Sequence, residues 1–179
     1  LFDRSRPGIE AGHLNPFIPD DTILEMAQQA AEALGVMWGP FKFDLLRDSR
    51  YGWIAMEAAT RLSGGYDSSY TCPMATGRDV YGAYLDMVLG QPLDLTKLEN
   101  RVGRSACCLA PVFQPGRISG WKETSSVNTR IFYRTSTEIR PLENNADRPV
   151  FVIADGVAYW DAFDEARMAA WNISPIYEA

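Results

Sequence analysis

The sequence is poor in the residues that most often build metal and redox sites: it has one histidine and three cysteines among 179 residues. Cys72, Cys107 and Cys108 have neither the CxxC nor the mixed Cys/His spacing of a zinc site. Adjacent cysteines such as 107 and 108 are typical of a strand in which they pack as small apolar residues. We therefore expect a reduced, cytoplasmic protein without structural zinc or a disulfide framework. The single histidine, His13, has no second histidine or cysteine nearby, and we assign it no chemistry.

Long apolar runs and basic clusters are also missing. The apolar stretches are short and interrupted by charge, so none reaches the roughly 18 to 20 residues of a membrane span, and we expect no membrane association. The net charge of −6 comes from acids scattered along the chain, and no group of Lys and Arg could track a phosphate backbone. Nucleic acid is therefore excluded as an expected partner.

The composition, 46% hydrophobic and 22% charged, is that of one globular domain with a sizeable core. Residues 1–8 contain neither an initiator Met nor the basic and apolar regions of a signal peptide, and we expect a chain that belongs to something longer. Apolar residues at helical spacing predict helices over 22–34, 78–89 and 159–171, and strands are predicted over 105–113, 128–134 and 149–154. The remaining segments are expected to be irregular: residues 1–20, a turn at 114–117, an ordered loop at 62–77 and a connection at 142–148. The predicted fold class is α+β, a mostly antiparallel sheet with helices packed on it.

A β-hairpin is predicted between residues 41 and 57. The segments 41–47 and 53–57 are separated by polar turn residues, and placing Asp44 opposite Glu57 makes opposed residue numbers sum to 101. This register leaves a four-residue turn, 49–52, which is an ordinary length. Because faces alternate along a strand, one face is predicted to be charged and the other apolar. The charged face would carry Lys42, Asp44, Glu57, Ala59 and the continuing Arg61, and the apolar face Phe41, Phe43, Leu45, Met56 and Ala58.

The two opposed carboxylates suggest a cation site. Asp44 and Glu57 repel each other across the hairpin unless a cation lies between them or water solvates both. Magnesium favours one or two carboxylates together with substrate phosphate oxygens, and Lys42 and Arg61 could then meet those phosphates. The alternative is a solvent-facing surface on which the acids simply pair with Lys42 and Arg61. Spacing alone does not choose between these interpretations.

Three segments carry a resemblance to a known family. Gly39 to Asp44, Ile54 to Gly65 and Ala75 to Asp79 resemble, in order and spacing, the closing part of ATP-grasp enzymes of the carbamoyl-phosphate synthase large-chain and biotin-carboxylase type. The resemblance extends over nearly the whole chain, 1–179. It implies the C-terminal half of an ATP-grasp domain, with the adenine hinge, the phosphate-binding lysines and the mobile lid of that family lying upstream of this chain.

The resemblance also implies roles for individual residues. Asp44 and Glu57 would bind the magnesium that bridges ATP phosphates, and Arg61 would steady the γ-phosphate or the acyl-phosphate, with Lys42 near the phosphates. The backbone of Ser63, Gly64 and Gly65 would approach the acyl acceptor. These roles are electrostatic, which suits phosphoryl transfer without a covalent nucleophile.

The implied function is an ATP-dependent ligase. ATP and Mg²⁺ would convert a carboxylate or bicarbonate to an acyl-phosphate, which an amine or another nucleophile attacks. One departure from the family pattern counts against it, because many members have Asn where this sequence has Ala59. Two alternatives therefore stand beside the ligase: an inactive binding or scaffold module, and one subunit of a split ligase completed by a partner chain.

Overall fold

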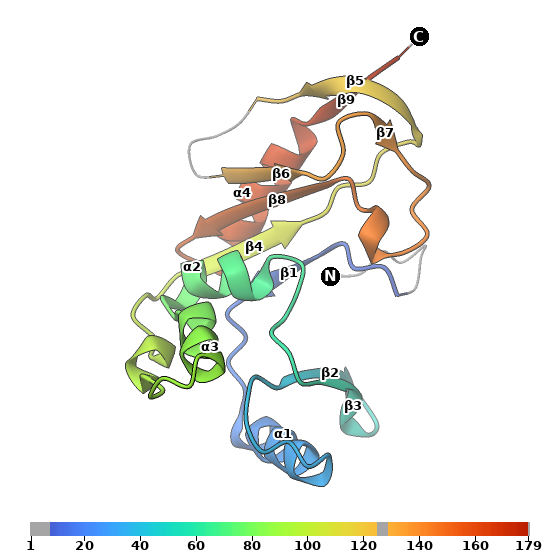
Figure 1. The fold of residues 1–179 in the computed structure, drawn as a ribbon. Helices are drawn as coiled ribbons and strands as arrows, with labels where there is room; N and C mark the ends of the chain where they lie inside the picture. Colours follow the sequence, from blue (N-terminus) through green and yellow to red (C-terminus); the bar gives the residue numbers. More distant parts are fainter. Residues whose placement is uncertain (1–7, 125–128, 179) are drawn as a thin grey trace. The chain divides into compact units, whose positions relative to one another are not determined.

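The computed structural model describes residues 8–124 and 129–178, and within them the chain folds into two compact units (Figure 1). The first unit comprises Leu1–Pro16, Tyr70–Arg78 and Asn100–Ala179, and the second comprises Phe17–Ser69 and Asp79–Glu99. Every strand pairing in the described residues is antiparallel, which confirms the predicted α+β class. Among these residues no helix is long and apolar enough to cross a bilayer.

The first unit is built on a four-stranded sheet in the order β1-β4-β8-β6. The strands are β1 (Gly12–Asn15), β4 (Ser105–Leu109), β6 (Thr129–Tyr133) and β8 (Val150–Gly156). The central strand β8 is buried along nearly its whole length because the helix α4 (Tyr159–Trp171) packs on it and on β4. The fully buried part of the core between helix and sheet consists of the small residues Cys107, Ala154, Ala162 and Ala166, and Leu14, Leu109 and Phe163 pack against them.

A second sheet of the first unit, in the order β7-β5-β9, was mostly not predicted. It contains β5 (Gly116–Lys122), β7 (Glu138–Ile139) and β9 (Ser174–Tyr177). The predicted turn at 114–117 is wrong from Gly116 onward, since β5 begins there. Residues 1–20 likewise include β1, which pairs with β4. Pro175 is accommodated because β9 is an edge strand, where a missing N–H costs no ladder bond.

The predicted loop at 62–77 is wrong in its second half. A π-helical turn, Asp67–Thr71, leads directly into the short helix α2 (Cys72–Thr76). Pro73 lies in the first turn of α2, where its missing N–H is tolerated. Gly77 ends the helix in a left-handed conformation, with its N–H bonded to the Pro73 carbonyl at 2.7 Å. A 3-10 turn, Asn145–Asp147, also lies in the segment predicted to be irregular.

The second unit contains α1 (Asp21–Ala33), a hairpin of β2 (Lys42–Asp48) and β3 (Gly52–Ala59), α3 (Val80–Val88) and a 3-10 turn at Leu95–Leu98. The predicted helices at 22–34 and 78–89 are confirmed to within two residues at each end. Asp20 caps α1 by accepting the Ile23 N–H, and Asp79 caps α3 by accepting the Gly82 N–H. Both helices end just before a glycine with positive φ, which permits the left-handed residue of a helix C-terminus.

Candidate functional site

The charged face of the β2–β3 hairpin is the candidate site. Asp44 lies directly opposite Glu57, and Lys42 lies opposite Ala59, so this half of the hairpin has the predicted register. Directly opposed residues share a face of the sheet, and their Cβ atoms lie about 5 Å apart. The fold therefore brings the two carboxylates together, as the sequence predicted.

The other half of the hairpin differs from the prediction. The register shifts after the Asp44–Glu57 pair, so Leu45 pairs with Ala55 and leaves Met56 without a partner in the ladder, as in a β-bulge. Met56 is 62% exposed and is not part of the predicted apolar face. The turn accordingly holds three residues, 49–51, and Gly52 closes it with φ +75°. Three-residue hairpin turns of this kind end on a left-handed residue, which favours glycine.

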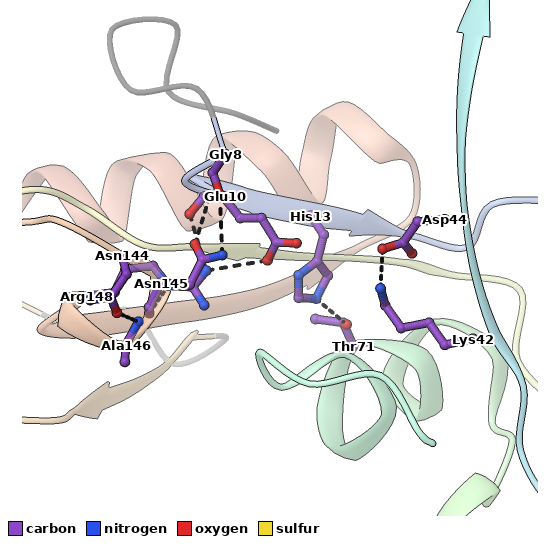
Figure 2. A network of polar contacts seen from close by, with 10 residues as sticks. All are labelled: Gly8, Glu10, His13, Lys42, Asp44, Thr71, Asn144, Asn145, Ala146 and Arg148. Carbon is purple, nitrogen blue, oxygen red and sulfur yellow. Dashed lines mark hydrogen bonds and ion pairs between the residues drawn. The ribbon is translucent and has the colours of Figure 1, made fainter. Parts of the chain in front are cut away.

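Lys42 joins the two carboxylates. Its ammonium group forms an ion pair with Asp44 (Figure 2) and lies 3.8 Å from the nearer Glu57 carboxylate oxygen. The Lys42 side chain is only 18% exposed, whereas Asp44 and Glu57 are 42% and 57% exposed. A positive charge thus already lies between the two acids, at the place where opposed carboxylates require one.

Arg61 completes the cluster from the segment after β3. Its guanidinium lies 3.5 Å from the Glu57 carboxylate and donates a hydrogen bond to the Leu62 carbonyl at 3.2 Å. The side chain is 54% exposed, so its ion pair is in contact with water and weak. Such a loosely held guanidinium keeps donors available for another oxyanion.

The donor set fits a magnesium ion that takes most of its ligands from water and nucleotide. Asp44 and Glu57 offer oxygen ligands from adjacent strands, which matches the one or two carboxylates typical of such sites. Within the described part of the chain, no cluster of three or more acidic, histidine or cysteine side chains could hold a metal ion on its own. Ala59 cannot contribute a ligand. The same cluster also satisfies the alternative interpretation, in which Lys42 and Arg61 neutralise the acids.

The Ser63-Gly64-Gly65 segment follows Arg61 closely in the sequence and forms a tight turn. The Ser63 N–H donates to the Ser68 hydroxyl at 3.0 Å, and the Gly64 carbonyl accepts the Asp67 N–H at 3.1 Å. Gly65 and the following Tyr66 both have positive φ. The Ser63 amide therefore stabilises the turn, and contact of this segment with an acyl acceptor stays a prediction.

Sequence reasoning missed Thr71, which lies at the centre of a polar cluster in the first unit. Its side chain is buried, and its hydroxyl lies 2.8 Å from both His13 Nε2 and Asn15 Nδ2, the first of which is drawn in Figure 2. Residues 13 and 15 share one face of β1. The alternation along the strand could have indicated that His13 and Asn15 lie on one face. Their common partner, Thr71, is 58 residues from His13, and no local pattern indicated it.

The cysteines occupy the predicted environment. Cys107 and Cys108 lie in β4 and are almost completely buried. Burial raises the pKa of the Cys107 thiol to about 12, so it stays protonated at neutral pH and is a poor nucleophile or metal ligand. They pack as small apolar residues.

The fold of the chain is similar to that of several solved structures. An L-amino acid ligase from Bacillus licheniformis matches 95% of the chain with a TM-score of 0.76 and 21% identity. Phosphoribosylglycinamide synthetase from Anaerococcus prevotii matches 95% with a TM-score of 0.79 and 16% identity. The biotin carboxylase domain of a Hydrogenobacter thermophilus 2-oxoglutarate carboxylase, solved with MgADP and bicarbonate, matches 94% with a TM-score of 0.67 and 16% identity.

The chain has an ATP-grasp fold. It spans 44%, 46% and 40% of these three solved chains, respectively, so the likeness covers less than half of each ATP-grasp enzyme. No protein-family model and no curated protein matches the sequence itself. The ATP-grasp likeness is therefore one of structure, and it agrees with the resemblance found in the three sequence segments.

Proposed function

We propose that this chain carries the magnesium and phosphate end of the active site of an ATP-grasp ligase. The overall reaction would join a small carboxylate, or bicarbonate, to an amine or another nucleophile through an acyl-phosphate made from ATP. The observation that carries the proposal is the direct opposition of Asp44 and Glu57 across the hairpin, with Lys42 and Arg61 beside them. The fold supports it, because the similar chains include a ligase, a synthetase and a carboxylase domain solved with MgADP.

Each charged side chain has a defined task in this proposal. Asp44 and Glu57 would hold the magnesium ion, whose contribution would be to neutralise phosphate charge. Arg61 donates to oxygens of the transferred phosphoryl group, where negative charge must be stabilised. Lys42, which contacts both carboxylates in this structure, would offer its ammonium group to the phosphates.

The rest of the site comes from outside this chain in the proposal. The segment that holds the adenine and the lid belongs either to an upstream part of the same polypeptide or to a partner chain. The length comparison supports this, since the chain spans less than half of each of the three ATP-grasp enzymes described above. The substrates would be a small-molecule carboxylate and a small-molecule amine.

One observation favours a second candidate, an ATP-grasp-like binding module without catalysis. Ala59 replaces the Asn of many family members and lies directly opposite Lys42, which together with Arg61 neutralises the two acids. In this case the cluster is a closed set of ion pairs, and neither magnesium nor nucleotide is required.

Isothermal titration of Mg-ATP into the longest expressible form of the protein tests the proposal. The decisive variant is Glu57→Gln, which removes a charge at nearly constant shape, and the matched control is Glu25→Gln, an exposed glutamate on α1. We expect magnesium-dependent binding that weakens at least about tenfold in Glu57→Gln, the size of one lost charge-assisted contact, and no change in the control.

Binding that is equal in wild type and Glu57→Gln would reject the site assignment. No binding in a folded protein that contains the upstream segment, or in the complex with its partner chain, would favour the non-catalytic module. Asp44→Asn provides an independent second variant, and it should weaken binding in the same magnesium-dependent way.

A further inference from the structure

A cationic cavity lies in the first unit, within a part of the chain separate from the hairpin site. Its volume is about 330 Å³, which is within the range of small-molecule sites. Two segments line it: residues 134–140, which include the β6–β7 turn and β7, and residues 146–149, which join the 3-10 turn to β8. The charged or hydroxyl residues that line it are Arg134, Thr135, Glu138, Arg140, Asp147 and Arg148.

Arg148 is the fixed element of this cavity. The residue is buried, its Nε donates to the Asn145 carbonyl at 2.7 Å, and one terminal nitrogen donates to the Glu10 carbonyl at 3.2 Å (Figure 2). Its guanidinium carbon lies 4.7 Å from the centre of the Phe151 ring. Burial lowers the pKa of Arg148, and the nearby charge of Arg134 lowers it further, whereas Glu10 raises it. The guanidinium is thus held in place with a second positive charge close to it.

The side chains of Arg134 and Arg140 are exposed to solvent. Neither side chain forms an ion pair or a hydrogen bond with any other residue that the structure describes. The backbone positions of both are nevertheless well anchored: the Arg134 N–H donates to the Pro149 carbonyl at 2.8 Å, and Ile139, next to Arg140, pairs with Gly116 of β5. The cavity therefore combines fixed backbone with available guanidinium donors.

The two acids of the cavity do not neutralise these arginines. The Asp147 carboxylate accepts the backbone N–H groups of Glu143 and Asn144, at 3.2 and 3.1 Å, and is used in capping the 3-10 turn. Glu138 is exposed and forms no ion pair with a described residue. The Arg148 guanidinium lies 3.6 Å from the Glu10 carboxylate, so Arg134 and Arg140 are the cavity arginines that lack a counter-ion among the described residues. An oxyanion bound beside them would supply this missing charge through charge-assisted, often bidentate hydrogen bonds.

We infer that this cavity is a binding site for a small anion that bears a phosphate or carboxylate group, with Arg134 and Arg140 as its ligands and Arg148 as its fixed floor. Both groups offer the planar or tripodal oxygens that guanidinium forks match. The inference does not depend on the proposed ligase function, because its residues all belong to the first unit.

Titration of inorganic phosphate and, separately, of succinate into the full chain at constant ionic strength tests the inference. The variants are Arg134→Gln and Arg140→Gln, and the control is Arg167→Gln, an exposed arginine of α4 whose ion pair with Asp164 lies on the helix surface. We expect saturable binding of at least one anion, weakened about tenfold or more in each cavity variant and unchanged in the control. Tighter phosphate binding identifies a phosphate-bearing ligand, and tighter succinate binding a carboxylate-bearing one.

Glu138→Gln makes the test sharper because it reverses the expected sign. Removing a negative charge from the cavity lining should tighten anion binding several-fold, since the Glu138 carboxylate repels a bound anion. Absence of binding by both anions, equal binding in the Arg134 and Arg140 variants, or weaker binding in Glu138→Gln would overturn the inference. All these side chains are exposed, so we expect the variants to fold, and a thermal melt checks this.

Discussion

Lys42 lies between Asp44 and Glu57 on the charged face of the hairpin, in contact with Asp44 and 3.8 Å from Glu57. A lysine therefore occupies the place where the proposed ligase site would put a divalent cation. The two interpretations of the cluster, metal site and closed ion-pair set, make different predictions about what happens when this lysine is removed.

Lys42→Met leaves two opposed carboxylates without the cation between them. We expect stability to fall by about 1 kcal/mol or less, because the acids are partly exposed and screened by water. Mg²⁺ should then raise the melting temperature more in the variant than in wild type, since it replaces the missing charge. Calorimetry with and without Mg²⁺ measures this, and Lys122→Met, at an exposed position, is the control. An equal effect of Mg²⁺ on both proteins would favour the closed ion-pair set.

Thr71→Val tests the polar cluster of the first unit. The substitution keeps the shape of a fully buried side chain but removes the hydroxyl that lies 2.8 Å from both His13 and Asn15. We expect a loss of about 1 to 3 kcal/mol, as for other buried hydrogen-bonding groups deprived of a partner. Urea denaturation measures it. Thr137→Val, at an exposed position, should cost less than about 0.5 kcal/mol, and equal losses in the two variants would contradict the assignment.

Gly156→Ala tests how closely α4 packs on β8. A Cβ atom at this position would lie 2.5 Å from the Ala162 nitrogen and 2.6 Å from the Asp161 Cβ, so the helix would have to move. We expect destabilisation of about 1 to 3 kcal/mol, typical of overpacking. Gly120→Ala in β5 has no atom within 4 Å of the added Cβ and should be nearly neutral. Thermal melts of both variants decide this, and a neutral Gly156→Ala would show that the helix is not held against the strand.

Cys107 predicts a loss of stability in alkali. Burial raises the pKa of its thiol from about 9.0 to about 12, so between these values the folded chain retains a proton that the unfolded chain releases. The ionisation of Cys107 therefore leaves the free energy of unfolding unchanged below about pH 9. It lowers that free energy as pH rises from about 9 to about 12, with a maximum slope of about 1.4 kcal/mol per pH unit. Urea denaturation at pH 8 and pH 10 measures the fall. Cys107→Ala should reduce it, and an identical fall in the variant would assign the effect to other groups.

Much of the fold could be predicted from local pattern. The helix 159–171 was predicted with its observed bounds, and the strands at 105–113, 128–134 and 149–154 were predicted, with shorter or shifted ends. Asn128, the first residue of one predicted strand, lies outside the described residues. These segments succeed because the period of their apolar residues reflects the burial of one face, which the sequence records directly.

The strands that were not predicted, β5 and β1, form mainly because they pair with other strands. β5 contains Gly116 and Gly120 and follows a proline, so its local preference is weak, and it forms a strand because it pairs with β7 and β9 at distant positions in the chain. β1 is short and depends on its pairing with β4, more than 90 residues away. Propensity is overridden in both by tertiary pairing, which a single sequence does not display.

The residue types of the candidate site, the hairpin that carries them and the opposition of Asp44 and Glu57 could all be read from the sequence, because the alternation of faces along a strand is a local property. The position of the register shift, the exposure of Met56 and the place of Lys42 beside both acids became known only from the folded chain. The tertiary structure also decided which arginines meet around one cavity. These features depend on side-chain packing and on contacts between residues far apart in the chain, and the free energy of such contacts is not encoded in any short segment.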